Sequence, residues 1–122
     1  MLNQIKVVGR GSSELKRGMT AGGVPVASFV LRCERGRKLK VPGERSEADF
    51  FDVVAWHSEA QKIEKWYHKG DLLFVEGRMK QRWVDGRKIW ELNADTVAVV
   101  DKRSKNYMGN KPGGLPAEVV TA

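Results

Sequence analysis

The chain concentrates its cations in two short stretches. Residues 35–45 hold five Lys or Arg against one acid, Glu44, and residues 78–88 hold five against one acid, Asp85. Closely spaced cations can contact successive phosphates of a polynucleotide, and the net charge of +7 also favours a polyanionic partner. The alternative is that both stretches are solvated surface charge. The cations that we expect to contact nucleic acid are Arg35, Arg37, Lys38, Lys40, Arg78, Lys80, Arg82, Arg87 and Lys88.

Four aromatic residues are spaced for stacking on unpaired bases. Phe50 and Trp56 are six residues apart in a segment with strand character, so both side chains lie on the same face. Trp83 and Trp90 flank an Asp-Gly turn and would extend this platform onto a hairpin. Stacking contributes about 1–3 kcal/mol per base, with little dependence on sequence. We therefore predict that these four rings contact bases, and we assign Phe29, Trp66 and Tyr67 to the core.

The sequence offers no recognisable catalytic or metal site. His57 and His68 are eleven residues apart, without a third ligand at a metal-binding spacing. Cys33 is the only cysteine, which excludes an internal disulfide, and no serine motif or phosphate-binding glycine loop is present. We expect no enzymatic activity, no metal and no cofactor.

The length and hydropathy of the chain indicate one small intracellular domain. A hydrophobic fraction of 41% in 122 residues supports a packed core. No apolar run approaches the roughly 20 residues that a membrane span needs, and the N-terminus lacks the pattern of a signal peptide. The single cysteine fits a reducing compartment. We therefore expect a cytoplasmic, nucleoid-associated protein without a membrane partner.

Hydrophobic periodicity predicts five strands and one helix. Strand patterns occupy residues 2–9, 24–31, 49–56, 72–83 and 89–100. Residues 58–68 carry apolar residues spaced for one helical face, with Ser58 as N-cap and Gly70 in the stop signal. Residues 11–23 and 36–47 are predicted to be connections. Within the last two strands, Gly77 predicts a bulge and Asp85-Gly86 a hairpin turn.

The order of these elements predicts the fold. Three strands, one helix and two further strands describe an all-β chain with one helix, which is the plan of the five-stranded OB-fold barrel with its helix between strands 3 and 4. Such a barrel binds its ligand across the second and third strands and the adjoining loops. We assign residues 1–100 to this domain and residues 101–122 to a flexible basic tail containing Gly and Pro.

Short motifs along this domain resemble those of bacterial single-stranded DNA-binding proteins, in the same order and at similar spacing. They are Met1-Leu2-Asn3, Val7-Val8-Gly9-Arg10, Gly23-Val24-Pro25-Val26-Ala27-Ser28-Phe29, Ala48-Asp49-Phe50, Val53-Val54-Ala55-Trp56, His68-Lys69-Gly70-Asp71, Val75-Glu76-Gly77-Arg78 and Ala94-Asp95-Thr96-Val97. The resemblance implies an OB-fold that binds single-stranded DNA, with little sequence preference, in DNA replication, repair and recombination. It also implies a homotetramer, base stacking by Phe50 and Trp56, and a position near a subunit interface for Phe51.

The chain departs from the family in three places. Residue Arg37 lies in a loop where many members carry an aromatic residue, and Trp83 lies six rather than seven residues beyond Gly77. Cellular members end in an acidic tip that recruits replication and repair enzymes, whereas residues 116–122 contain one acid, which makes this recruitment doubtful. Two explanations stay open: the protein works without these partners, as in a phage, plasmid or specialised paralogue, or the chain is a truncated form. Three alternatives stay open: a dimeric primosomal replication-restart OB protein, an RNA-binding OB module, and an assembly scaffold that would leave both basic stretches unexplained.

Overall fold

The computed structural model describes residues 1–35 and 48–102, which form six strands and one helix. The strands are β1 (Ile5–Gly11), β2 (Lys16–Met19), β3 (Pro25–Glu34), β4 (Ala48–Trp56), β5 (Leu72–Val84) and β6 (Arg87–Asp101), and the helix is α1 (His57–Trp66). The connection between β3 and β4 and the chain after Lys102 lie outside the described residues, so the predicted tail stays a prediction.

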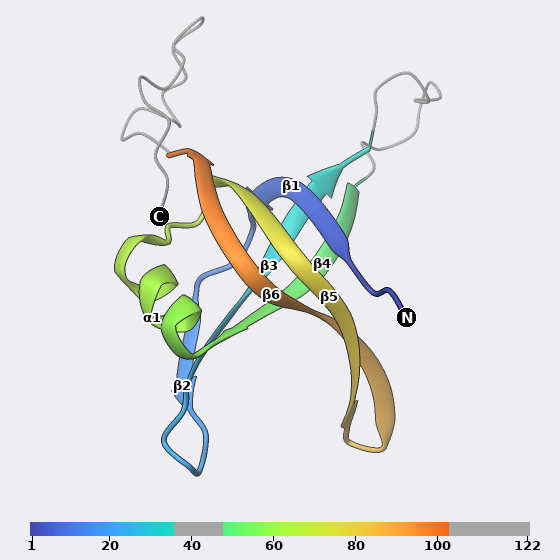
Figure 1. Cartoon of the computed structure of the whole chain (residues 1–122). Coiled ribbons are helices and arrows are strands. Elements are labelled where there is room, and N and C mark those ends of the chain that lie inside the picture. The colour runs from blue at the N-terminus through green and yellow to red at the C-terminus, as the bar shows by residue number, and fades with distance from the viewer. Residues whose placement is uncertain (36–47, 103–122) are drawn as a thin grey trace, which may run out of the picture.

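Five of the strands close into a barrel. Strand β1 pairs with β3 and β5, β6 pairs with β5 and β4, and β4 pairs with β3. All pairings are antiparallel except that of β4 with β6, which joins only Val53 to Leu92 and Val54 to Asn93. Figure 1 shows α1 on one side of the barrel and the β5–β6 hairpin projecting away from it. This topology confirms the predicted OB-fold barrel, with the helix between its third and fourth strands.

The prediction that residues 11–23 form only a connection was wrong. Residues Lys16–Met19 form β2, which pairs with the beginning of β3 from Lys16↔Ser28 to Met19↔Pro25. All four residues of β2 are exposed, and one of them is Gly18, so the segment lacks the hydrophobic alternation that predicts a strand. The strand forms because β3 extends beyond the barrel and offers an edge for backbone pairing.

The core lies inside the barrel and follows the alternation of its strands. On β4, Val53 and Ala55 are fully buried, whereas Phe50 and Asp52 point outward and are exposed. From α1, Ile63 is fully buried in the same cluster. The ring centroids of Phe29 and Tyr67 are 4.8 Å apart in this core, and Trp66 is partly buried against it. The core assignment of Phe29, Trp66 and Tyr67 is therefore confirmed.

The helix begins one residue earlier than predicted and ends two residues earlier. Trp56 occupies the N-cap position, with extended backbone and no side-chain capping bond, so the prediction of Ser58 as N-cap was wrong. Tyr67 follows the helix as C-cap, and Gly70, at φ +101°, turns the chain toward β5. Within residues 1–35 and 48–102, no helix has the length and apolar character that spanning a membrane requires.

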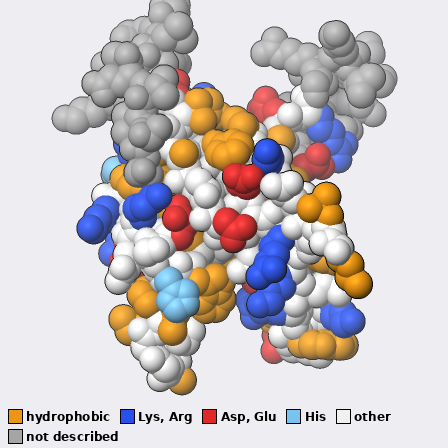
Figure 2. All heavy atoms as spheres, viewed as in Figure 1, with side chains coloured by type: hydrophobic (Ala, Val, Ile, Leu, Met, Phe, Trp, Pro, Cys, Tyr) orange, Lys and Arg blue, Asp and Glu red, His pale blue; other side chains and the backbone are white. Residues whose placement is uncertain are grey.

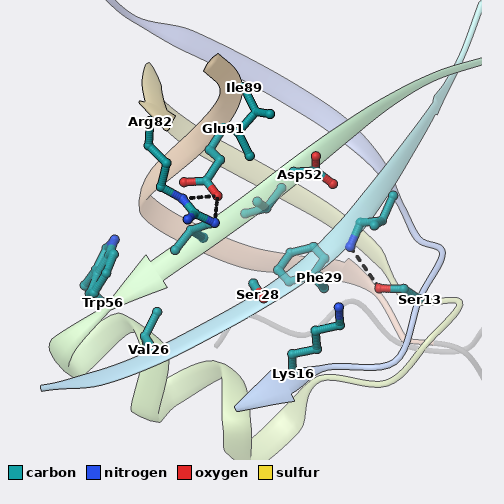
Figure 3. Close-up of a pocket in the computed structure, with 13 residues that line it drawn as sticks. Ser13, Lys16, Val26, Ser28, Phe29, Asp52, Trp56, Arg82, Ile89 and Glu91 are labelled. Carbon is teal, nitrogen blue, oxygen red and sulfur yellow. Dashed lines mark hydrogen bonds and ion pairs between the residues drawn. The ribbon is translucent and has the colours of Figure 1, made fainter. Parts of the chain in front are cut away.

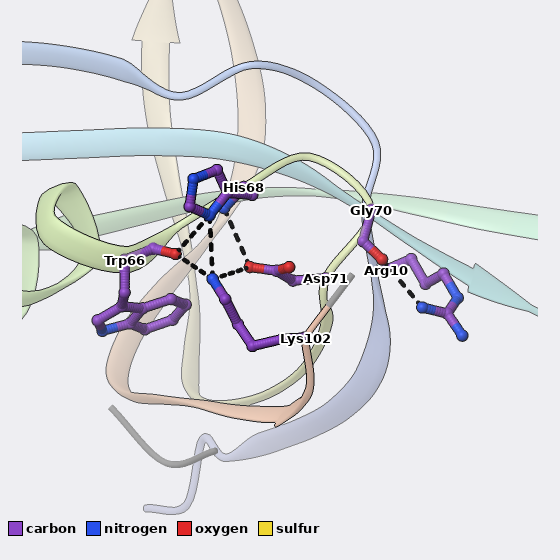
Figure 4. Close-up of polar contacts among 6 residues, drawn as sticks. All are labelled: Arg10, Trp66, His68, Gly70, Asp71 and Lys102. Atoms are coloured by element: carbon purple, nitrogen blue, oxygen red, sulfur yellow. Dashed lines mark hydrogen bonds and ion pairs between the residues drawn. The ribbon is translucent and has the colours of Figure 1, made fainter. Parts of the chain in front are cut away.

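A buried ion pair ties the end of β6 to the loop that enters β5. The carboxylate of Asp71 is fully buried, and Nζ of Lys102 lies 3.1 Å from its Oδ2. The same Nζ donates to the carbonyl of Trp66 at 2.6 Å, and the backbone N–H of His68 donates to Asp71 at 3.0 Å (Figure 4). On the neighbouring strand, Arg10 donates to the carbonyl of Gly70 at 2.9 Å. These contacts hold both barrel strands at this end to the chain that leaves α1.

The β5–β6 hairpin carries both backbone features predicted for it. Asp85 and Gly86 have φ angles of +49° and +79°, as a two-residue hairpin turn of type I′ requires. The register shifts between Glu76 and Gly77, which marks a bulge, and a side chain at Gly77 would overlap the carbonyl of Asn93. The bulge and the turn therefore delimit the part of the hairpin that leaves the barrel.

Candidate nucleic-acid interface

The projecting hairpin has two chemically different faces. Directly paired residues of antiparallel strands point to the same side, and the register pairs Trp83 with Lys88 and Gln81 with Trp90. Both tryptophans therefore lie on one face as diagonal neighbours, and they are 66% and 56% exposed. The opposite face carries the cations of β5 together with Arg87 of β6. We call these the aromatic face (Gln81, Trp83, Lys88 and Trp90) and the cationic face (Arg78, Lys80, Arg82 and Arg87).

The Phe50 depression, of about 790 Å³, lies beside the aromatic face of the hairpin. It forms where β4 separates from β6, because these strands pair only at Val53 and Val54. Phe50, which is 61% exposed, and Trp90 both line it, together with Met79 at the root of the hairpin. Two of the rings predicted to stack on bases therefore share one open space.

The N-terminal segment forms one wall of the Phe50 depression. The side-chain amide of Asn3 donates to the carbonyl of Met79 at 2.8 Å and accepts from its backbone N–H at 3.1 Å. This pair of hydrogen bonds resembles the pairing of one residue in a β-ladder, and it holds residues 2–4 at the root of the hairpin. This role of Asn3 was not predicted, since nothing in the residues around Asn3 signals a side chain that pairs with backbone.

The Trp56 depression, of about 550 Å³, lies on the other side of the hairpin (Figure 3). Trp56 ends β4, and its Nε1 donates to Oδ1 of Asn93 on β6 at 2.9 Å, which fixes one edge of the ring. The cationic face contributes Arg82, and β2 contributes Lys16. Lys16 was not among the predicted contacts, because its strand was not predicted.

Two of the predicted phosphate contacts already have acidic partners. Nε and Nη2 of Arg82 both lie 2.8 Å from Oε2 of Glu91, whose side chain is only 7% exposed. The hydrogen bond and charge of Glu91 raise the pKa of Arg82. Similarly, Nη2 of Arg35 lies 2.7 Å from Oδ1 of Asp49, and this hydrogen bond lowers the pKa of Asp49. Part of the charge of Arg82 and Arg35 is therefore neutralised within the protein.

The other predicted cations differ in their surroundings. Among the described residues, Arg78, Lys80 and Arg87 are exposed and form no ion pair. Nζ of Lys88 lies 5.4 Å from the ring centroid of Trp83, within cation–π range. Arg37, Lys38 and Lys40 lie outside the described residues. Figure 2 shows Lys and Arg over the β5–β6 hairpin and also on the side of α1, with acidic side chains toward the middle of the same view.

Phe51 faces inward rather than outward. It is partly buried, packs against the core cluster and also lines the Phe50 depression. Packing within one chain therefore accounts for its apolar character, and its position near a subunit interface stays a prediction. The described residues also contain no group of three His, Cys, Asp or Glu side chains placed to hold a metal ion.

The barrel and its projecting hairpin define an OB-fold protein of the kind that offers a strand face and its loops to a polymeric ligand. The model of the Single-strand binding protein family matches residues 2–102, and the chain belongs to this family. The resemblance inferred from the sequence motifs is thus confirmed.

Individual relatives and structures agree with this membership. The chain is 34% identical to the single-stranded DNA-binding protein of Halalkalibacterium halodurans, over 95% of this chain and 74% of that protein. It is 35% identical to that of Streptococcus pneumoniae, over 85% and 69%. It is similar to the Plasmodium falciparum SSB complex with ssDNA at a TM-score of 0.64 and 27% identity, over 77% of this chain and 87% of the other. The SSB domain of a Synechococcus protein shares the fold, with a TM-score of 0.62 and 20% identity over 80% and 94%.

Proposed function

We propose that this protein binds single-stranded DNA with little sequence preference and catalyses no reaction. The observation that carries the proposal is the hairpin between two depressions, with exposed rings on one side and cations on the other. The bases of a single strand can expose flat faces on which rings stack, whereas the bases of a duplex are already stacked on one another. Because all four bases have such a face, stacking depends little on sequence. The family membership and the single-stranded DNA-binding proteins among its relatives support this function. The proposal includes a role of this binding in DNA replication, repair and recombination.

In this proposal the rings bind the bases of the DNA strand and the cations bind its phosphates. Phe50 and Trp90 stack on bases in one depression, and Trp56 stacks on a base in the other. Trp83 extends the aromatic face toward the turn. Cations without an acidic partner, above all Arg78, Lys80 and Arg87, hold phosphates and release counterions on binding.

The proposal includes a homotetramer in the cytoplasm, associated with the nucleoid. The family resemblance supports this assembly, and a dimer is the alternative that a primosomal type of protein would form. Light scattering of the purified protein distinguishes the two by mass. A tetramer would also support the predicted place of Phe51 near a subunit contact.

Tryptophan fluorescence provides the direct test. Adding an oligo-dT strand should quench the emission, and Trp56→Ala and Trp90→Ala should each weaken binding by about 1–3 kcal/mol, the contribution of one stacked base. Trp66→Phe is the matched control, because Trp66 packs against the core and its replacement should leave affinity unchanged. Stronger binding to duplex DNA than to the single strand would contradict the proposal. Equal-length DNA and RNA strands separate this function from that of an RNA-binding module.

A further inference from the structure

Asp52 lies where the two depressions of the proposed interface meet. Its carboxylate faces outward on β4, on the same face as Phe50 and Trp56 and nearer to Phe50. Of the residues that the structure describes, only Asp52 lines both the Phe50 depression and the Trp56 depression. Asp52 is exposed, and within the described residues it makes no hydrogen bond or ion pair, as its labelled side chain in Figure 3 illustrates.

A DNA strand whose bases stack in both depressions has to pass Asp52. Six residues of a β-strand span roughly 20 Å, so one or more nucleotides lie between the two stacked positions. At this point the carboxylate repels phosphates. When ionised, it accepts hydrogen bonds and has no proton to donate, so it binds only groups that carry a donor. The exocyclic amines of cytosine and adenine are such donors, whereas thymine and uracil present a carbonyl oxygen at the corresponding position. The N3–H of thymine and uracil also donates, but it lies between two carbonyl oxygens that the carboxylate repels.

The neighbouring charges leave this acceptor available. Glu91, the other acid of the Trp56 depression, is held by a hydrogen bond from Nε of Arg82 and an ion pair with its Nη2. Lys16 lines the same depression and provides a site for a phosphate away from the carboxylate. The nucleotide at the junction is therefore expected to turn a base edge, not its phosphate, toward Asp52.

We propose that Asp52 is a specificity-determining residue that favours bases with an exocyclic amine over thymine and uracil at the junction of the two depressions. The inference rests on the proposed function and refines it: stacking remains indifferent to sequence, and one carboxylate adds a bias on top of it.

Oligo-dC and oligo-dU of equal length provide the test, since cytosine and uracil are similar in size and differ only at C4, which carries an amine or a carbonyl, and at N3, which carries a proton in uracil alone. Competition for a labelled oligo-dT at slightly alkaline pH should show about five-fold or greater preference for oligo-dC in the unmodified protein. Asp52→Asn should bring the ratio close to one, because an amide can also donate to the uracil carbonyl. It should also tighten binding of oligo-dU by removing the repulsion.

Asp95→Asn is the matched control, because Asp95 is an exposed acid on β6 that lines neither depression. It removes the same charge and should keep the preference for oligo-dC. Equal binding of both oligonucleotides by the unmodified protein, or a preference that survives Asp52→Asn, would overturn the role of Asp52 while the proposed function stands. Failure to bind any of the oligonucleotides would overturn both.

Discussion

Replacing three cations of the hairpin should flatten the salt dependence of DNA binding by a calculable amount. Arg78, Lys80 and Arg87 share the cationic face and have no ion pair among the described residues. Each phosphate contact with a single strand contributes about 0.7 to the slope of log K against log salt concentration. Substituting all three by Gln should therefore reduce the slope by about 2. If both proteins bind equally at about 1 M salt, this difference amounts to roughly a hundred-fold weaker binding at about 0.1 M.

The assay is fluorescence anisotropy of a labelled oligo-dT strand over a series of salt concentrations. The control carries Gln in place of Lys62, Lys65 and Lys69, which lie on or just after α1, away from the hairpin (Figure 1). Both triple variants lower the net charge from +7 to +4, so a general charge effect would change them equally. An unchanged slope in the hairpin variant, or an equal change in the α1 variant, would refute the assignment of phosphate contacts to the cationic face.

Three further predictions concern the framework of the barrel. Lys102→Met should lower the free energy of unfolding by about 3 kcal/mol in urea titrations, because it leaves the buried carboxylate of Asp71 without this cation, and adding Asp71→Asn should recover part of the loss. Gly86→Val should cost about 1–2 kcal/mol by the same measurement, because Gly86 lies at φ +79°. Burial, with smaller contributions from the charges of Asp71 and Glu14, raises the pKa of Tyr67 to about 12. Between the ordinary pKa of about 10 and this raised value, the folded state keeps the phenol proton of Tyr67, whereas the unfolded chain releases it. The free energy of unfolding should therefore be retained below a pH of about 10 and fall as the pH rises toward about 12. Tyr67→Phe should remove the tyrosine ionisation seen near the upper pH in a spectrophotometric titration.

The sequence predicted the barrel well because its elements carry strong local signals. The alternation in β4 placed Phe50 and Trp56 on one outward face, and the structure confirms this. The Asp85-Gly86 turn is likewise encoded by two residues that tolerate positive φ. What alternation does not reveal is where two strands separate. The parting of β4 from β6 beyond Val53 places the two rings in different depressions, and only the three-dimensional path of the strands shows it.

Contacts made by polar side chains were the harder part of the site to predict. A two-residue turn pairs Lys80 directly with Glu91, yet the acid binds the diagonal neighbour Arg82 through two nitrogens. Side-chain length and the bidentate geometry of a guanidinium decide between these partners, and neither enters a pattern of hydrophobicity. Asn3 presents the same difficulty, since its partner is the backbone of a residue far along the chain.

The turn length of the hairpin determines which of its side chains share a face. Trp83 and Trp90 are seven residues apart, and on one continuous strand an odd separation would place them on opposite faces. They share the aromatic face only because exactly two residues, Asp85 and Gly86, lie outside the ladder that pairs Val84 with Arg87. One inserted residue would shift the register by one and exchange a ring for a cation on one side of the hairpin. The separation of the exposed rings from the cations of the hairpin is thus a consequence of turn geometry as much as of amino-acid composition.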